Sequence, residues 1–216
     1  ALRNGIGIPK DKEAEIIYLL KSANQGYIES LFAVYTYFFE VDDPRSIRYL
    51  RTSAFKTYPP GLHMYGYAIE HGVGLSNDKA INFFWAGAQN HYPFCLNNYA
   101  TRITDINLSN KLWKEAAEKG LKQAQYNYAV SLMIGRGDVQ MDKEKAAIMM
   151  KKSSDQQYGP SMFDYALMLR EGIGVQKDEK LAEEICIKAG QYKIQTEVAL
   201  SKMEKTYQLI REKMNH

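Results

Sequence analysis

The feature that most constrains this chain is a pair of small residues that recurs at intervals of 29 to 37 residues. Each pair ends a stretch with the apolar periodicity of a helix, and a large apolar residue stands four positions before it, on the same helical face. One helix, called helix B here, therefore recurs six times. The pairs are Ser22-Ala23, Ser53-Ala54, Gly87-Ala88, Ala116-Ala117, Ser153-Ser154 and Ala189-Gly190, and the large residues are Tyr18, Tyr49, Phe83, Leu112, Met149 and Ile185.

A second recurring position predicts a partner for helix B. Twelve residues after the first member of five pairs stands a branched or aromatic residue, and a small residue follows it in four cases. A large residue beside a small one lets a neighbouring helix approach closely, so we expect a helix A in each repeat. Neither helix can bury its apolar face alone. The large positions are Val34, Tyr65, Tyr99, Tyr128 and Tyr165, followed by Gly66, Ala100, Ala129 and Ala166.

The connections agree with this period. The spacing from helix B to the next helix A is constant, whereas the link from A to B varies in length, so insertions fall on one edge. The long links contain Gly-x-Gly, and a glycine just past a helix end can adopt the left-handed conformation that closes the helix. An aspartate four or five residues later predicts the N-cap of helix B. The loops begin at Gly5, Gly72, Gly135 and Gly172, and the aspartates are Asp11, Asp78, Asp142 and Asp178.

These residues resemble the Sel-one-like repeat (SLR) family, whose members are related to tetratricopeptide repeats. The segment from Ala124 to Ala129, then Gly135-x-Gly137, Asp142 and Ala146-Ala147 carry the resemblance, which covers roughly residues 5 to 192. It is degenerate around 28 to 57 and 94 to 120. The resemblance implies a right-handed α-solenoid that scaffolds protein complexes and has no catalytic activity of its own.

We therefore expect an all-α fold, a right-handed α-solenoid of stacked antiparallel helix pairs forming a single domain over residues 1–216. The predicted units are a half repeat at 1–27, repeats at 28–58, 59–92, 93–121, 122–158 and 159–193, and a capping helix at 194–216. The helix at 12–24 lacks its own helix A, so we expect either another repeat upstream in the parent protein or a partner that covers it.

Composition and cysteine usage narrow the partners and the compartment. A net charge of +3 is far below that of a typical nucleic-acid binder, so we expect no nucleic-acid partner. No apolar run is long enough to enter a membrane as a span. Two cysteines cannot build a disulfide framework, which favours a reducing intracellular compartment, either cytoplasm or mitochondrion. We expect both Cys95 and Cys186 in the core.

The sequence predicts no catalytic, cofactor or metal site. His63 and His71 are eight residues apart, whereas metal-binding pairs on a helix are four apart. The Gly-x-Gly loops lack the third glycine and the lysine of phosphate-binding loops, so we interpret them as turns.

The candidate binding surface is a second stripe on the stacked A helices, called the groove stripe here. Its mixture of aromatic, hydroxyl and amide side chains suits an extended peptide or a helix. The alternative is that part of the stripe only packs successive A helices together. The predicted groove residues are His63, Tyr67, Glu70, Asn97, Thr101, Thr104, Tyr126, Val130, Met133, Leu167 and Arg170, and the same spacing adds Phe32, Thr36, Phe39 and Phe163.

The predicted function is a non-enzymatic adaptor that binds segments of partner proteins in this groove, within a larger complex. Two alternatives stay open: an RNA-binding helical-repeat protein, and the docking module of a longer enzyme.

Overall fold

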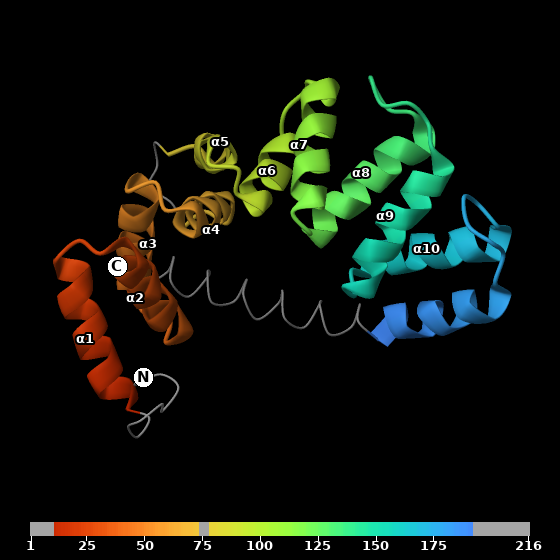
Figure 1. Cartoon of the computed structure of the whole chain (residues 1–216). Coiled ribbons are helices and arrows are strands. Elements are labelled where there is room, and N and C mark those ends of the chain that lie inside the picture. Colours follow the sequence, from red (N-terminus) through yellow and green to blue (C-terminus); the bar gives the residue numbers. More distant parts are fainter. Residues whose placement is uncertain (1–10, 74–77, 192–216) are drawn as a thin grey trace. The chain divides into compact units, whose positions relative to one another are not determined.

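The computed structural model describes residues 11–73 and 78–191, and every regular element in these ranges is helical (Figure 1). A further helical segment covers residues 179–191. The expected all-α fold is therefore confirmed. The labelled helices are α1 (Lys12–Asn24), α2 (Ile28–Glu40), α3 (Arg45–Phe55), α4 (Pro59–Glu70), α5 (Ala80–Gln89), α6 (Pro93–Ala100), α7 (Ile106–Glu118), α8 (Lys122–Ile134), α9 (Lys143–Asp155) and α10 (Gly159–Glu171).

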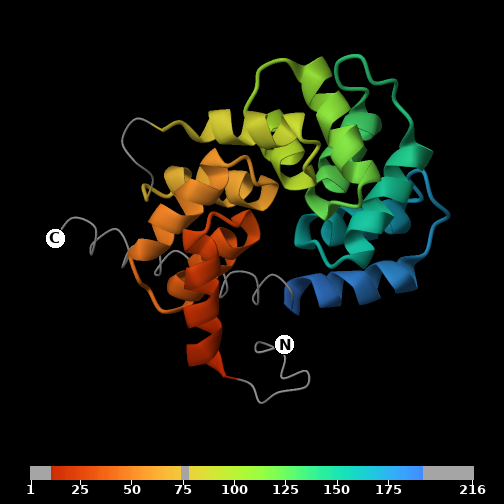
Figure 2. The ribbon, with the colours of Figure 1, turned by 60° about the vertical axis from the view of Figure 1, so that its left-hand side comes forward.

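The described residues form two compact units. The first unit contains α1 to α5, and the second contains α6 to α10 with the segment 179–191. Within each unit, every helix packs against the next one along the chain. Both views show α8, α9 and α10 following one another in this way (Figure 1, Figure 2). The stacking of consecutive helix pairs, expected from the period, is thus present in both units.

The small pairs lie where helix B meets the following helix A. Both members are buried in four of the six pairs, and Ala23 and Ala189 are buried in the other two. At Gly61 of α4, a β-carbon would collide with the side-chain oxygen of Ser53 on α3. Small residues on both helices therefore set how closely the two backbones approach.

Three of the five large positions of helix A are buried between the helices, and the other two, Tyr99 and Tyr128, are half-buried. Val34 and Tyr65 are fully buried, and Tyr165 is 5% exposed. A β-carbon at Gly66, next to Tyr65, would lie 2.7 Å from the Phe84 ring of α5. The large-then-small couple therefore works as expected, because the small residue admits a ring from the neighbouring helix.

One turn, repeated between each helix B and the next helix A, explains their constant spacing. The residue four positions after the first member of each of the first five pairs has a left-handed backbone, and the next residue is the N-cap of helix A. In four of the five turns, the N–H of this N-cap residue donates to the carbonyl of the first small residue, which is the Schellman closure of helix B. The left-handed residues are Gly26, Thr57, His91, Gly120 and Gln157.

The described glycines of the Gly-x-Gly loops also have positive φ. Gly135 and Gly172 are the left-handed C-caps of α8 and α10, as predicted. Gly72, Gly137 and Gly174 have φ between 62° and 72°. The loop at Gly5, Gly74 and the predicted capping helix at 194–216 lie outside the described residues.

Three of the four predicted aspartate caps are confirmed. Asp11, Asp142 and Asp178 each accept a hydrogen bond from the backbone N–H three residues later, at 2.9 Å. The prediction for Asp78 is wrong, because α5 is preceded by Lys79 and has no side-chain cap.

Asp78 instead accepts hydrogen bonds from the Tyr65 hydroxyl at 2.6 Å and from Nε of Arg51 at 3.2 Å. The phenol oxygen belongs to a fully buried side chain, and a buried hydroxyl without a partner is costly. Asp78 therefore serves as the hydrogen-bond acceptor of the buried Tyr65 hydroxyl and does not cap α5.

Candidate functional site

In the second unit, the groove stripe continues from α8 to α10. The rings of Tyr126 and Tyr158 are 5.6 Å apart, and Asp164 of α10 lies near the Tyr126 side chain. Burial, followed by the nearby Asp164 carboxylate, raises the pKa of Tyr126. Val130 and Met133, one and two turns further along α8, are half-buried against the core of this unit.

The stripe residues of α10 are much more exposed than those of α8. Phe163 is 42% exposed and Leu167 is 46% exposed, and these two side chains are one helical turn apart. Arg170 is also exposed and forms an ion pair with Glu171 at 3.0 Å. Large apolar side chains left open in a row are typical of binding surfaces.

A hollow of about 330 Å³ adjoins this exposed row, and we call it the α10 hollow. One wall belongs to α10 and the other to the helical segment 179–191. Its volume is at the lower end of the range of about 300–1,000 Å³ typical of ligand-binding clefts. The lining residues are Phe163, Ala166, Leu167, Arg170, Glu179, Ala182, Glu183 and Cys186.

The two cysteines differ, and the expectation that both belong to the core is wrong for Cys186. Cys95 is buried, and burial raises the pKa of its thiol to about 12. Cys186 is exposed and lines the α10 hollow. Its counterparts Trp113 and Met150 are buried and lie on helices covered by α8 and α10.

On the short helix α6, the predicted groove residues differ from those on α8 and α10. Asn97 is only 8% exposed, and its amide oxygen accepts a hydrogen bond from Asn127 of α8 at 2.9 Å. Thr101 is the C-cap of α6 and is exposed. Asn97 thus belongs to the packing between successive A helices, the alternative to a groove role that the sequence left open.

The expectation that helix A extends to Thr104 is wrong. α6 ends at Ala100, and Thr104 is in the loop before α7. Two side chains close the helix early: the Ser109 hydroxyl donates to the Ala100 carbonyl at 2.8 Å, and Arg102 donates to the Asn98 carbonyl at 2.8 Å. Satisfying these terminal carbonyls lets the chain turn within the short link to α7.

In the first unit, the stripe residues on α4 take part in local packing. His63 is half-buried with its ring 6.4 Å from that of Phe84, and Tyr67 stacks on His71 at 4.2 Å. Glu70, at the end of α4, is exposed. On α2, the rings of Phe32 and Phe39 both contact Tyr35, while Thr36 lines a shallow hollow against α1.

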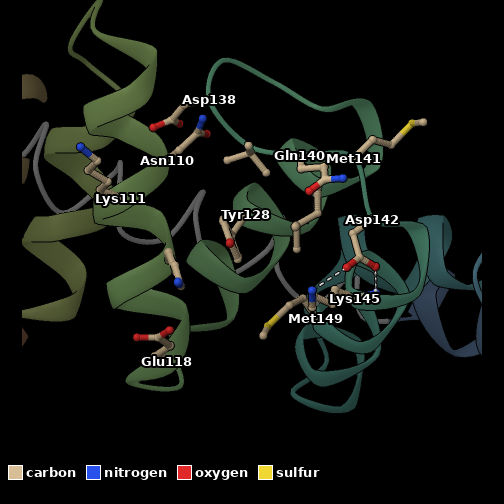
Figure 3. Close-up of a pocket in the computed structure, with 13 residues that line it drawn as sticks. Asn110, Lys111, Glu118, Tyr128, Asp138, Gln140, Met141, Asp142, Lys145 and Met149 are labelled. Carbon is tan, nitrogen blue, oxygen red and sulfur yellow. Dashed lines mark hydrogen bonds and ion pairs between the residues drawn. The ribbon is translucent and has the colours of Figure 1, made fainter.

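A larger hollow, of about 580 Å³, lies between α7, α9 and the loop that joins α8 to α9, and no sequence pattern indicated it. Figure 3 shows Lys111 and Glu118 on one side, Lys145 and Met149 on the other, and Tyr128 between them. Lys145 and Asp142 form an ion pair at 2.7 Å, and the hydrogen bonds from Lys145 lower the pKa of Asp142. Cations and anions are mixed along this rim, so its charge selects no ligand class.

Comparison with known proteins settles the family. The Sel1 repeat model matches residues 1–27, 59–85, 100–121, 122–158 and 159–191, which is more than half of the chain. The chain belongs to the Sel1 repeat family. The resemblance read from the sequence is confirmed. Of the two segments marked as degenerate, the one at 28–57 is not matched, whereas most of the one at 94–120 is matched, over residues 100–121.

Solved structures show the same fold for this Sel1 repeat chain. A protective antigen of uropathogenic Escherichia coli strains with an SLR fold is 22% identical, with a TM-score of 0.73, over 97% of this chain and 50% of its own. A Sel1 repeat protein from Oxalobacter formigenes is 23% identical, with a TM-score of 0.72, over 88% and 59%. An immunity protein from Pseudomonas aeruginosa is 14% identical, with a TM-score of 0.52, over 81% and 73%.

The chain therefore spans between half and three fifths of the first two structures. No curated protein matches it significantly in sequence. Sel1 repeats are in general protein-interaction modules, which gives the broad class of function. Among the helices of the described ranges, none has the length and hydropathy required to cross a bilayer.

Proposed function

We propose that this Sel1 repeat chain is a non-catalytic adaptor that binds a segment of a partner protein along the groove stripe of its second unit. The observation that carries the proposal is the exposure of Phe163 and Leu167, one turn apart beside the α10 hollow. Sel1 repeat proteins are typically scaffolds without catalytic activity.

The energetic argument rests on how much apolar surface remains to be covered. Fully burying a Leu or Phe side chain contributes about 1.5–3 kcal/mol, so covering two half-exposed ones contributes about that much in total. Anchors of this kind dominate the free energy of protein association, while the polar positions around them set register. Tyr126 and the nearby Asp164 offer such polar groups beside the row.

A position-specific photo-crosslinking experiment tests the proposal. A photoreactive amino acid is placed at Leu167 or, as a matched control, at Ile148 of α9, which is 54% exposed. We expect adducts with one protein from position 167 and none with that protein from position 148. The crosslinked segment is then mapped by mass spectrometry and produced as a peptide.

Calorimetry with that peptide gives the quantitative result. Leu167→Glu should weaken binding by about tenfold or more, because a carboxylate replaces an apolar anchor. Ile148→Glu should leave the affinity within about twofold, as expected for a residue outside the interface. Equal adducts from both positions, or equal effects of both substitutions, would refute the proposal.

A further inference from the structure

The walls of the α10 hollow differ in chemistry from its floor. Ala166 and Ala182 are buried small residues at the centre, and Phe163 and Leu167 flank them on α10. Phe163 and Arg170, which bound this row on α10, are seven residues apart, so the row extends for about 10 Å, or two helical turns. The opening therefore accepts a short length of partner, with apolar side chains entering at its centre.

The wall formed by residues 179–191 is acidic. Glu179 and Glu183 line it one turn apart, and both are exposed. Glu179 forms an ion pair with Lys177 at 2.7 Å. Within the described part of the chain, Glu183 has neither an ion pair nor a hydrogen-bond partner for its carboxylate. An unpaired carboxylate at the edge of an apolar opening attracts a cation and repels an anion.

The opposite wall cancels only part of this charge. Arg170 is the one basic residue that lines the hollow, and its guanidinium is held by Glu171 at 3.0 Å. The charge of Arg170 also acts on Glu179, where it adds to the hydrogen bond from Lys177 in lowering the pKa. Asp164, next to Phe163 on α10, adds another carboxylate, which lies near Tyr126. Among the described residues around the opening, carboxylates therefore outnumber cations, and an acidic segment or a nucleic acid would be repelled.

From these observations we infer that the α10 hollow binds a basic amphipathic helix of a partner protein. This inference rests on the proposed function and adds the chemical class of the partner. Two apolar side chains one turn apart enter between Phe163, Leu167 and Ala182, and a lysine or arginine on the same helix faces Glu183. The binding mode is a helix in a groove.

The geometry favours a helix over an extended segment. The hollow lies between two helices, and its lining groups are side chains rather than a sheet edge that could pair with an extended backbone. A helix satisfies its own backbone hydrogen bonds and brings residues i and i+4 to one face. That spacing matches the spacing of Phe163 and Leu167 on α10.

A displayed library of helical peptides, selected against the full chain, tests this inference. We expect enriched peptides to carry two large apolar residues one turn apart and an excess of Lys and Arg over Asp and Glu. A synthetic representative should bind more weakly as salt increases, because the charged pairs are exposed. Selection of acidic or uncharged helices, or no enrichment, overturns the inference.

Two variants tie the selected peptide to this surface. Leu167→Glu should weaken binding by about tenfold. Glu183→Lys should weaken it by about fivefold at low salt, and replacing the facing lysine of the peptide by glutamate should restore affinity.

Ile148→Glu is the control and should leave the affinity of the peptide unchanged. If Leu167→Glu lowers the urea midpoint, Phe163→Ala is used in its place. Binding that is insensitive to Leu167→Glu overturns the inference.

Other occupants of the hollow give different results. If a second copy filled it, wild type would sediment as a dimer and Leu167→Glu as a monomer. If residues 192–216 filled it, Leu167→Glu would speed hydrogen exchange in that segment. Either result overturns the inference. If position 167 forms adducts with an acidic segment of a partner, only the predicted partner class is wrong. If position 167 forms no adducts with any partner protein, the proposed function is wrong.

Discussion

Gly174 lies so close to the carbonyl oxygen of Lys143 that a β-carbon at this position would overlap it. At Gly137, a β-carbon would meet the side-chain oxygen of Asn107, in the first turn of α7. In these two loops the second glycine therefore packs on the preceding helix B, whereas the first glycine, Gly135 or Gly172, ends helix A. The two glycines of one motif have different structural roles.

Gly174→Ala should destabilise the protein more than Gly172→Ala. Both residues have positive φ, of 62° and 69°, so alanine at either position costs about 1–2 kcal/mol in the left-handed region. Only at Gly174 does the new methyl group meet backbone, which adds about 1–3 kcal/mol. Urea unfolding of the two variants measures the difference, and equal midpoints would contradict the packing role.

Thr57→Gly should stabilise the first unit. Thr57 is a β-branched residue with φ of 60° at the turn between α3 and α4, where glycine has no steric penalty. We expect a gain of about 1 kcal/mol in the free energy of unfolding. Lys56→Gly is the control: its φ is −85°, so glycine there should only lose stability. A loss for Thr57→Gly would show that the turn is not strained.

Asp142→Asn should reveal a pH-dependent contribution at the start of α9. The side-chain hydrogen bond from Lys145 holds the pKa of Asp142 below its ordinary value of 3.8, so the carboxylate form stabilises the fold above the unfolded-state pKa. This contribution is lost as the pH falls through the lowered folded-state pKa. Asparagine still caps a helix but carries no charge.

The stability difference between wild type and Asp142→Asn should therefore be present at about pH 7 and vanish at about pH 2. Asp142→Ala also loses the cap hydrogen bond to the Lys145 N–H, so it should be less stable than Asp142→Asn at both pH values. Urea midpoints at the two pH values provide the measurement. A difference that persists unchanged in acid would mean that the charge of Asp142 makes no contribution.

A thiol-specific disulfide reagent should modify one cysteine in the folded protein. Cys186 is exposed, whereas Cys95 is buried and its pKa is raised to about 12, so almost no thiolate forms there near neutral pH. Cys186→Ser should abolish the rapid reaction, and denaturant should release the second thiol. Occupation of the α10 hollow by a helix should slow modification of Cys186. Rapid reaction of two thiols in the folded state would contradict the burial of Cys95.

Much of the fold could be predicted because the signals for it are local. The small pairs, the large-then-small couples and the Gly-x-Gly loops each act within a few residues, and the structure places them as expected. The turn from helix B to helix A was missed, because Thr57, His91 and Gln157 occupy left-handed positions where the sequence rules look for glycine.

Residues whose role depends on a distant partner could not be assigned from the sequence. Asp78 has the position of an N-cap but is bonded to Tyr65 and Arg51 instead. Asn97 has the spacing of a groove residue. Its amide oxygen instead accepts a hydrogen bond from Asn127, thirty positions later, so Asn97 is part of the packing between A helices.

The recurrence of helix pairs and the burial of most of their small residues follow from the sequence alone, because helical periodicity and cap chemistry are short-range. Which large side chains are covered depends on contacts between neighbouring repeats: Tyr18, on the same face as Ser22, is 63% exposed. Phe163 and Leu167 remain exposed beside a hollow, while Asn97 at an equivalent spacing is covered. The proposed binding surface therefore centres on α10, where both of these side chains border the hollow.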